Sequence, residues 1–374
     1  MMRNNKKVVV FCSDNITSLG LVRCLGEAGY RPECYCYGHV RFILSSRYVS
    51  KGKRFGSAEE VLCFLLNQYP CYEERPILLT IPDPPALLVD NHKDELSRKF
   101  ILSSAGKQGM ISYWMSKINI SNLAKKHGFQ VPWSRVLKKD EPIPDDIEYP
   151  VFTKDILSFD GGKCNERICN NHEELEEVKS GITADSFIAM QYVRKVREIN
   201  YLGLAIKGKV YMDFHDIRDR FPSGGYGHYN SFIKYEHDDF HNRIVRLIKE
   251  TKYEGLFDVE FIIDKDGNHY FMEVNFRVDG EVYKLCEGIN LPAEWCRLCT
   301  LPIEKLPDEL KTKKEYFIGI TELSDFKASV LSGQVGLFKW LWQFMTADRR
   351  MLVNMKDPLP AFVKIIEMII SRIA

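Results

Sequence analysis

The sequence predicts an α/β protein that opens with a β-α-β unit. Lys7 to Cys12 (KVVVFC) is a continuous apolar run, as in the buried strands of parallel sheets. Ser13-Asp14-Asn15 offers a helix cap, Thr17 to Ala28 is amphipathic with helical spacing, and Gly29 favours a helix end. Arg31 to Tyr37 is the next predicted strand. The turn after the first strand has no G-x-G-x-x-G pattern, so a dinucleotide is not the expected ligand.

Length and composition are those of an ordinary globular protein. At 374 residues the chain is long enough for two or three domains with well-filled cores. Hydrophobic residues make up 45% and charged residues 28%. The net charge of +1, without a Lys/Arg-rich run, gives no reason to expect a nucleic-acid partner. The eleven cysteines are scattered as in a reduced cytosolic protein, and Cys296-x-x-Cys299 is expected to be a coincidence of one helix face.

The most informative stretch is Gly255 to Arg277 (GLFDVEFIIDKDGNHYFMEVNFR), which predicts two strands joined by a turn at Asp264 to Asn268. Glu260 and Glu273 lie on opposite arms of this hairpin, where both can project to the same face. Asn275 follows Glu273 by two residues and shares that face. Two carboxylates and an amide oxygen predict a site for Mg²⁺, or Mn²⁺, bridged to nucleotide phosphates. The alternative is an acidic hairpin in contact with solvent.

This hairpin resembles the last motif of the ATP-grasp superfamily of carboxylate–amine and carboxylate–thiol ligases. That motif has an acid, a hairpin and then E-x-N-x-R, and it stands here as Glu260, Glu273-Val274-Asn275 and Arg277. Phe276 replaces the usual proline. Upstream motifs also match, in order, from about Lys117 to Pro292. The order of the motifs is more specific than any one of them.

Two further segments resemble one branch of the superfamily, the D-aspartate ligase-like proteins. They are D-N-x-x-S-L-G-x-x-R-x-L at residues 14–25 and Asp-Pro-Leu-Pro at residues 357–360. Several proteins of that branch are linked to cell-surface glycan assembly. The resemblance therefore implies a role in building a bacterial cell envelope.

The resemblance implies a fold of α/β class with α+β lobes. A Rossmann-like pre-ATP-grasp domain is expected over residues 1–110. The two-lobed ATP-grasp fold follows, with a small lobe carrying the ATP lid over residues 111–195 and a large lobe with the metal and catalytic site over residues 196–312. A helical C-terminal extension is expected over residues 313–374.

The resemblance also implies which residues hold ATP. Lys117 and Lys154 take the two lysine positions assigned to the α- and β-phosphates. The turn at residues 158–163 is expected to cover the phosphates as a lid. Its members Ser158, Gly161 and Gly162 are small, and the two glycines allow the backbone to approach closely.

Adenine is expected against the predicted strand Phe187 to Val193, where Gln191 and Val193 would present main-chain groups to the base. Many relatives have an acid at the position of Gln191, so no side-chain role is assigned there. Glu198 takes the position expected to accept hydrogen bonds from the ribose hydroxyls. The alternative for Glu198 is a charge on an edge strand.

Three arginines are candidates for contact with reacting groups. Arg277 follows Asn275 by two residues and would balance charge on an acyl phosphate and a tetrahedral intermediate. Arg218 and Arg220 begin a polar, glycine-rich stretch and could grip a carboxylate substrate, although an ordinary surface loop is the alternative. Asp258 lies two residues before Glu260 and is either a further ligand or structural.

The implied reaction begins with attack of a substrate carboxylate on the γ-phosphate of ATP, giving an acyl phosphate and ADP. An amine then displaces phosphate. The expected substrates are small molecules, an amino acid with a peptide or cell-envelope precursor, and a homodimer is expected from family habit. Two alternatives remain open. One is a carboxylase or carbamoyl-phosphate-type enzyme that uses bicarbonate, and the other is a non-catalytic ATP-binding scaffold or regulator.

The C-terminal segment leaves the superfamily pattern at about Tyr316. Gly336 to Met345 (GLFKWLWQFM) carries four aromatic residues, and Ala361 to Ala374 (AFVKIIEMIISRIA) is apolar at helical spacing. Both segments could lie at a membrane interface or dock on a membrane-bound partner, or they could pack back on the body. No signal peptide and no run of eighteen apolar residues is present in the sequence, which predicts a cytoplasmic location, with peripheral contact at the inner membrane surface as an option.

Overall fold

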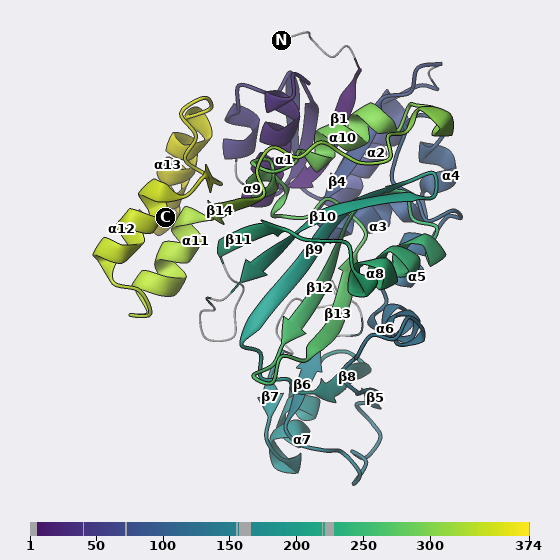
Figure 1. The fold of residues 1–374 in the computed structure, drawn as a ribbon, viewed down its shortest axis with the longest axis vertical. Helices are drawn as coiled ribbons and strands as arrows, with labels where there is room; N and C mark the ends of the chain where they lie inside the picture. Colours follow the sequence, from purple (N-terminus) through teal and green to yellow (C-terminus); the bar gives the residue numbers. More distant parts are fainter. Residues whose placement is uncertain are drawn as a thin grey trace.

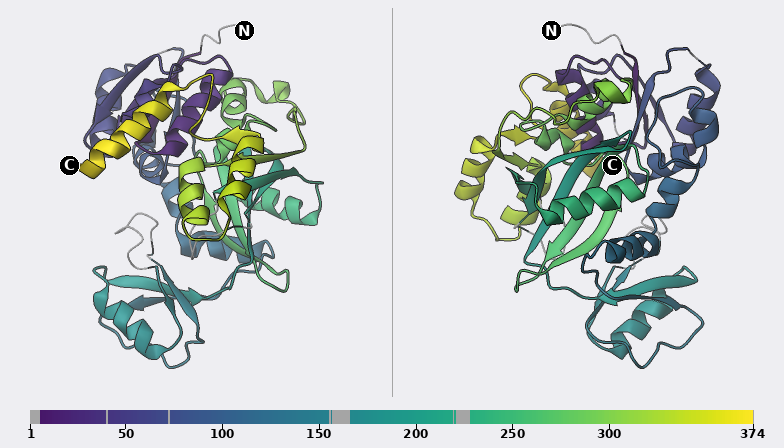
Figure 2. Two further views of the ribbon diagram at one scale, coloured as in Figure 1. Left: turned by 90° about the vertical axis from the view of Figure 1, so that its left-hand side faces the viewer. Right: turned by 45° about the vertical axis from the view of Figure 1, so that its right-hand side comes forward.

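The computed structural model describes residues 6–39, 41–71, 73–154, 156, 166–218, 220 and 228–373. In these residues the chain forms three sheets with helices packed against them (Figure 1). A seven-stranded sheet lies in the middle of the molecule. The N-terminal sheet lies at one end of it and a small four-stranded lobe at the other (Figure 2).

The N-terminal domain is a parallel sheet in the order β3-β2-β1-β4. Its helices connect strands that point the same way, which is the β-α-β arrangement that the sequence predicts. Asn15 caps α1 by accepting a hydrogen bond from the Ser18 N–H at 2.9 Å. The elements are β1 (Val8–Ser13), α1 (Ile16–Glu27), β2 (Glu33–Tyr37), a 3-10 turn (Phe42–Ser45), β3 (Lys51–Phe55), α2 (Ala58–Gln68), β4 (Ile77–Ile81), α3 (Asp83–Asn91), α4 (Lys93–Leu96) and α5 (Met110–Trp114).

The small lobe is a four-stranded antiparallel sheet in the order β5-β8-β6-β7, backed by one helix. Its own apolar core includes Phe187 and Leu175, both fully buried. This core does not merge with the others, and Figure 2 shows the lobe projecting from the body. Its elements are β5 (Ser134–Lys138), β6 (Val151–Lys154), β7 (Ile168–Cys169), α7 (His172–Gly181) and β8 (Ser186–Gln191), and α6 (Lys117–Lys126) leads into it.

The central sheet has the order β13-β12-β9-β10-β11-β14-β15. Its strands alternate between two faces, so each face carries every second residue. One face packs on α6 and α8 through apolar side chains such as Ile199, Val259 and Phe261. The elements are β9 (Arg197–Ile206), β10 (Lys209–Arg218), β11 (Tyr229–Lys234), α8 (Asp239–Glu250), β12 (Gly255–Ile263), β13 (His269–Asn275), α9 (Val282–Leu285), α10 (Leu291–Leu298) and a 3-10 turn (Ile303–Lys305).

The other face of the central sheet changes character along its length. At one end Leu202, Leu204 and Phe214 pack into the core that the sheet shares with α1, α9 and α10. Toward the small lobe, the same face carries acids, amides and an arginine instead. The N-terminal domain and the central sheet are therefore parts of one hydrophobic core, and the polar groups begin where that core ends.

The C-terminal segment is helical, as the sequence predicts, but it also adds two strands to the central sheet. β14 (Tyr316–Ile320) pairs with β11, and β15 (Arg349–Arg350) pairs with β14 at the sheet edge. The helices are α11 (Glu322–Asp325), a π-helical turn (Phe326–Val330), α12 (Leu337–Thr346) and α13 (Leu359–Ile373). Within the described residues, no helix is both long and apolar enough to cross a membrane.

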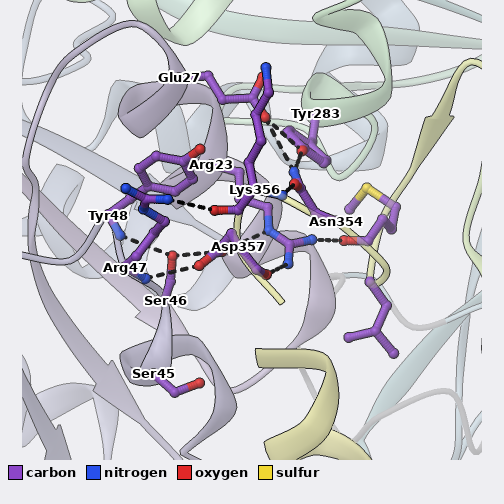
Figure 3. Close-up of polar contacts among 12 residues, drawn as sticks. Arg23, Glu27, Ser45, Ser46, Arg47, Tyr48, Tyr283, Asn354, Lys356 and Asp357 are labelled. Atoms are coloured by element: carbon purple, nitrogen blue, oxygen red, sulfur yellow. Dashed lines mark hydrogen bonds and ion pairs between the residues drawn. The ribbon is translucent and has the colours of Figure 1, made fainter. Parts of the chain in front are cut away.

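A buried ion pair fastens the C-terminal segment to the N-terminal domain (Figure 3). Arg23 of α1 donates from Nε to Asp357 Oδ2 at 3.0 Å, and neither side chain is more than 1% exposed. The Arg23 guanidinium also donates to the carbonyls of Met351 and Asp357, at 2.5 and 2.8 Å. Asp357 accepts in addition from Ser46 Oγ and the Arg47 N–H. Both charges are thus fully hydrogen-bonded, which offsets the loss of their hydration.

We expect Asp357→Ala to lower the free energy of unfolding by about 3–5 kcal/mol, because it leaves the Arg23 charge buried without a partner. Urea unfolding of the full chain measures the loss. The matched control is Asp308→Ala, because Asp308 pairs with Lys209 while its own side chain is 99% exposed, and this change should have no measurable effect. Arg23→Met combined with Asp357→Leu should recover much of the stability. Equal stability of Asp357→Ala and the wild type would contradict this role.

Candidate active site

A row of polar residues crosses four neighbouring strands of the central sheet. Glu273 of β13 pairs with Glu260 of β12, Glu260 pairs with Asn200 of β9, and Asn200 pairs with Asp216 of β10. Directly opposed residues of antiparallel strands project to the same face. The four side chains therefore lie side by side on the polar face. Residues two positions along each strand extend the row into a patch.

The facing of Glu260 and Glu273 depends on an irregularity in the hairpin. From the turn, Ile263 pairs with His269 and Phe261 pairs with Phe271. Continuing at that register would place Met272 opposite Glu260 and turn Glu273 to the apolar face. The register instead shifts by one residue between Glu260 and Phe261, as at a β-bulge, and Glu273 moves opposite Glu260. The shift brings the two carboxylates together.

Asn275 binds the acids of the adjacent strand. Its Nδ2 donates to Glu260 Oε1 at 2.8 Å and approaches Asp258 Oδ2 at 3.3 Å. Asp258 pairs with Asn275 across the ladder and is fully buried, and its Oδ1 has no hydrogen-bond partner among the described residues. The hairpin thus holds three acidic side chains and one amide in a small volume.

Burial and like charge both act on these acids. Burial, with the neighbouring Glu273 charge next in size, raises the pKa of Glu260 to about 7. Burial, followed by the charges of Asp279 and Glu260, raises the pKa of Asp258 well above its usual range. Burial also raises the pKa of Asp216 to about 6, and the nearby Arg218 works against that rise. Unbalanced negative charge is the electrostatic character of this patch.

Arg218 is the last residue of β10. It lies two positions after Asp216 and so projects to the same polar face of the sheet. Its Nε donates to Asp216 Oδ2 at 2.9 Å, and its Nη1 and Nη2 lie 3.8 Å from Glu198 and 3.9 Å from Glu281. Its side chain is only 7% exposed. The sequence predicts Arg218 at the start of a polar, glycine-rich stretch, whereas the structure places it in a strand with three acidic neighbours.

Further hydrogen bonds continue the network away from Arg218. Asn230 of β11 donates to Asp216 Oδ2 at 2.7 Å, and Lys284 of α9 donates to Asn230 Oδ1 at 2.6 Å. Lys284 is fully buried and pairs with Glu281 at 2.5 Å. This chain of contacts ties the polar patch to the helix that covers the neighbouring part of the sheet.

Arg277 links the hairpin to the N-terminal domain. Its Nε donates to Asp83 Oδ1 at 2.6 Å, and its Nη1 donates to Asp279 Oδ2 at 3.3 Å. Asp83 is the first residue of α3, at the carboxyl end of β4. The edge of the parallel sheet and the end of β13 therefore meet at this arginine, which is 14% exposed.

The predicted ATP-binding residues are distributed over the small lobe and the elements beside it. Lys117 is the first residue of α6, and Lys154 is the last residue of β6, with its Nζ 5.8 Å from the centre of the Phe152 ring. Gln191 ends β8, where its N–H donates to the Trp133 carbonyl at 2.8 Å. Val193 follows two residues later in the connection to β9.

The main-chain groups of Gln191 and Val193, which are predicted to face adenine, differ in their hydrogen bonds within the protein. The Gln191 N–H is used within the small lobe, whereas among the described residues no backbone hydrogen bond outside the helices and strands involves Val193. Glu198, near the start of β9, lies on the same strand face as Asn200 and pairs with Lys195 as well as Arg218. The structure thus places Glu198 next to the polar patch.

Other predicted positions lie elsewhere. Ser158, Gly161 and Gly162 fall outside the described residues. Arg220 contacts the C-terminal segment, donating to Asp325 Oδ2 at 2.6 Å and to Gln343 Oε1 at 2.9 Å. Arg220 therefore lies apart from Arg218, although only one residue separates them in the sequence.

Sequence reasoning did not single out several members of the patch, namely Asn200, Asp216, Asn230, Asp279, Glu281 and Lys284. One pattern could have revealed two of them. Glu198-Ile199-Asn200 and Asp216-Ile217-Arg218 both alternate polar and apolar residues, which places their polar members on one strand face. Lys284 carries no such local pattern, because tertiary packing alone brings it here.

The donor set suits a hard divalent cation. Glu260 and Glu273 offer facing carboxylates, Asn275 offers an amide oxygen, and the orphaned Asp258 Oδ1 adds unbalanced negative charge. In the described part of the chain, no three Asp, Glu, His or Cys side chains converge tightly enough to hold a metal ion by themselves. A cation bound here would therefore need ligands from Asn275 and from a bound molecule.

Comparisons with known proteins agree with this fold. The sequence model for the ATP-binding domain of the carbamoyl-phosphate synthase L chain matches residues 231–297, which include Glu260, Glu273, Asn275 and Arg277. N5-carboxyaminoimidazole ribonucleotide synthase of Aquifex aeolicus (strain VF5) is 32% identical over 181 residues, which are 46% of this chain and 48% of that protein. The chain thus matches about half the length of this relative.

Solved structures with the same fold include two kinds of enzyme. L-amino acid ligase from Bacillus licheniformis superposes with a TM-score of 0.63 at 14% identity, over 83% of this chain and 78% of that one. The biotin carboxylase domain dimer of Hydrogenobacter thermophilus 2-oxoglutarate carboxylase, in complex with MgADP, ADP and bicarbonate, gives 0.60 at 18% identity, over 84% and 73%.

The fold is that of ATP-grasp proteins, and the match over residues 231–297 agrees with the superfamily predicted from the sequence. The predicted fold class and superfamily are confirmed. The domain boundaries, the individual site residues and the narrower resemblance to D-aspartate ligase-like proteins stay predictions. The names of these relatives contain no reference to the cell envelope, so that expectation has no support from them.

We expect Arg218→Met to destabilise the protein by about 3–5 kcal/mol, because Asp216 is fully buried and would lose its counter-charge. Adding Asp216→Asn should restore part of the loss, since no isolated charge then remains at that position. Urea unfolding of both single variants and the double variant forms a double-mutant cycle. Full stability of Arg218→Met would contradict this structural role of Arg218.

Proposed function

We propose that this protein is an ATP-dependent ligase that activates a carboxylate as an acyl phosphate and joins it to an amine. The carboxylate oxygen attacks the γ-phosphorus of ATP, the bond between that phosphorus and the β–γ bridging oxygen breaks, and ADP leaves. The amine nitrogen then attacks the acyl carbon, and inorganic phosphate and a proton are released. The phosphoryl group supplies the activation, so the protein mainly positions reactants and balances charge.

The observation that carries this proposal is the facing pair Glu260 and Glu273, with Asn275 bonded beside them. The chain places two acids opposite each other although like charges repel, and burial strengthens that repulsion. A Mg²⁺ ion held by these side chains would remove this cost and would supply positive charge to offset that of the phosphates. Glu260, Glu273 and Asn275 would hold it.

The remaining roles follow the superfamily pattern. Arg277 supplies positive charge to the acyl phosphate, and Asp83 and Asp279 fix its orientation. Arg218, held by Asp216, faces the substrate side of the same patch and would contact the carboxylate substrate. The residues assigned to ATP are Lys117, Lys154, Ser158, Gly161, Gly162, Gln191, Val193 and Glu198.

An amino acid is the substrate class that we favour for this reaction. The similarity to an L-amino acid ligase supports it, because that fold is conserved over most of both chains. A peptide or cell-envelope precursor as the second substrate rests on the sequence resemblance alone. The enzyme would work with small molecules, and a homodimer is part of the same proposal.

A second candidate is a reaction that activates bicarbonate. It is favoured by the 32% identity to N5-carboxyaminoimidazole ribonucleotide synthase and by the bicarbonate complex of the biotin carboxylase domain. Both candidates use a carboxylate-type oxygen and release ADP. Incorporation of isotopically labelled bicarbonate into product separates them, since an amino-acid ligase incorporates none.

The test of the activity is ADP release by the purified chain with Mg-ATP over a panel of amino acids, paired amines and bicarbonate. We expect at least one amino acid to stimulate ADP release only when an amine acceptor is present, with a condensed product visible by mass spectrometry. Nucleotide binding without stimulation by any member would instead favour the ATP-binding scaffold. Stimulation by bicarbonate alone would favour the second candidate.

We expect Glu273→Gln to reduce turnover at least about 100-fold, because one carboxylate ligand to the cation is lost. The folded state should be unharmed, since the change removes a like charge facing Glu260. Asp266→Asn, on the exposed turn of the same hairpin, is the matched control and should keep wild-type turnover.

Binding gives the second readout of the same variant. At a concentration about 100 times Kd, Mg-ADP should stabilise the wild type by about 2.7 kcal/mol, and Glu273→Gln should lose most of that gain. Wild-type turnover in Glu273→Gln would show that the hairpin does not hold the metal.

A further inference from the structure

We infer that the C-terminal helices form a docking surface for an anionic lipid bilayer. The surface consists of the outward residues of α12 and α13, together with the exposed lysines on and beside these helices, and is called here the tail surface. α12 packs beside β14 of the central sheet, and α13 packs on the 3-10 turn Phe42–Ser45 of the N-terminal domain. Figures 1 and 2 show α11, α12 and α13 on one side of the molecule. The inference does not depend on the proposed catalytic activity.

The outward side of α12 is apolar. Phe338 is 87% exposed, and Trp342 and Met345 are each 68% exposed. The spacing of these residues, four and three apart, places them along one helix face. Trp340 alone in this helix is buried, with its ring stacked on Phe344 and its Nε1 donating to Asp325 at 2.8 Å. Trp340 and Phe344 therefore anchor the helix, whereas Phe338, Trp342 and Met345 project outward.

α13 also exposes apolar side chains to the outside of the molecule. Phe362, Ile366 and Ile370 are 63%, 54% and 59% exposed and recur every fourth residue, so they form a stripe. Two charged residues of the helix, Lys364 and Glu367, turn inward instead. Lys364 Nζ lies 4.8 Å from the centre of the Phe42 ring, and Glu367 Oε1 accepts from the Arg41 N–H at 2.6 Å. A surface helix normally presents its charged side to water, and this one presents its apolar side.

The acids of the C-terminal segment are turned away from the tail surface. Asp325 binds Arg220, Asp348 binds Lys314, and Asp357 binds Arg23. The buried Glu322 accepts from the main-chain N–H groups of Leu352 and Val353. Glu322, Asp325 and Asp357 are buried, and Asp348 is exposed but paired with Lys314.

Three lysines of the segment remain at the surface. Lys327, Lys339 and Lys356 are exposed. Arg350 donates to the carbonyls of Phe344 and Met345, which carry no formal charge. The tail surface thus combines exposed aromatic and aliphatic side chains with positive charge, and this combination complements anionic headgroups over acyl chains.

The dimensions favour a bilayer surface over a spanning segment. α13 has 15 residues and is therefore about 22 Å long, against about 30 Å for the hydrocarbon core. α12 is shorter, with 10 residues. Two short helices with outward apolar stripes lie in the interface plane, where Trp342 and Phe338 can insert among the headgroups.

Firm attachment to the body makes this surface able to orient the whole protein. The buried Arg23–Asp357 pair holds the connection before α13, and the Arg220–Asp325 pair holds the turn before α12. Docking would therefore fix the direction of the central sheet relative to the membrane.

The test is co-sedimentation of the full chain, without nucleotide, with phosphatidylcholine vesicles and with vesicles that also contain phosphatidylglycerol. We expect binding to the anionic vesicles with a blue shift in tryptophan fluorescence, and much weaker binding to the neutral ones. Phe338→Glu with Trp342→Glu should weaken binding at least about tenfold, because two apolar side chains no longer enter the interface. The matched control is Ile303→Glu, at an apolar residue 50% exposed outside the tail surface, which should bind as the wild type does.

A charge arm separates the electrostatic contribution. Lys339→Glu with Lys356→Glu should weaken binding to anionic vesicles about fivefold for each charge removed and leave binding to neutral vesicles unchanged. Lys249→Glu, at an exposed lysine of α8, is the control for net charge. Melting temperatures show that each variant folds.

Two results would overturn the inference. The first is no binding of the wild type to either kind of vesicle. The second is self-association, in which analytical ultracentrifugation gives a dimer that Phe338→Glu with Trp342→Glu dissociates while vesicle binding is absent. In that case the tail surface is an interface between two copies of the chain.

Discussion

Repulsion between acidic side chains on adjacent strands is the constraint around which the centre of this structure is arranged. Glu273, Glu260 and Asp216 occupy one row of the sheet, and Asp258 lies beside it. Hydrophobic packing on the opposite sheet face fixes the strands, so the acids have no freedom to separate. Their charge must be offset by protonation, by fixed cations or by a bound ion. Burial, with the Glu273 charge next in size, raises the pKa of Glu260, and the Arg218 charge acts against this rise.

The protein's own cations are placed at the margins of the patch. Arg218 and Lys284 neutralise the side formed by Asp216 and Glu281, and Arg277 neutralises the side formed by Asp83 and Asp279. The hairpin acids between them are bridged mainly by the Asn275 amide, which is neutral. The positive charges thus lie on two sides of Glu260 and Glu273. Because Arg277 binds Asp83 of the N-terminal domain, that domain also sets the position of a positive charge beside these two acids.

Sequence alone predicts the hairpin and its ligand types but not the geometry that joins them. The turn at Asp264 to Asn268 fixes the register of its immediate neighbours, and simple counting from it would turn Glu273 away from Glu260. The register shift at Met272 cannot be predicted from the local sequence. It depends on the packing of Phe271 and Val274 on the opposite, apolar face of the sheet. Likewise, alternation could predict Asp216 and Arg218 as a pair, whereas Lys284 arrives from a separate helix. The fold class, by contrast, follows from strand and helix patterns that are local.

The two sequence motifs that lie outside the superfamily pattern prove to be one structural unit. Arg23 belongs to the N-terminal motif at residues 14–25 and Asp357 to the C-terminal Asp-Pro-Leu-Pro, and they form the buried ion pair. A buried pair of this kind is a weak source of net stability, but it penalises every arrangement in which either partner is alone. It therefore specifies where the C-terminal segment docks more than how strongly. Charge and hydrogen bonds at Asp357 therefore fix where α13 begins. Ala361 and Val363 pack on the core, while the stripe of Phe362, Ile366 and Ile370 stays exposed.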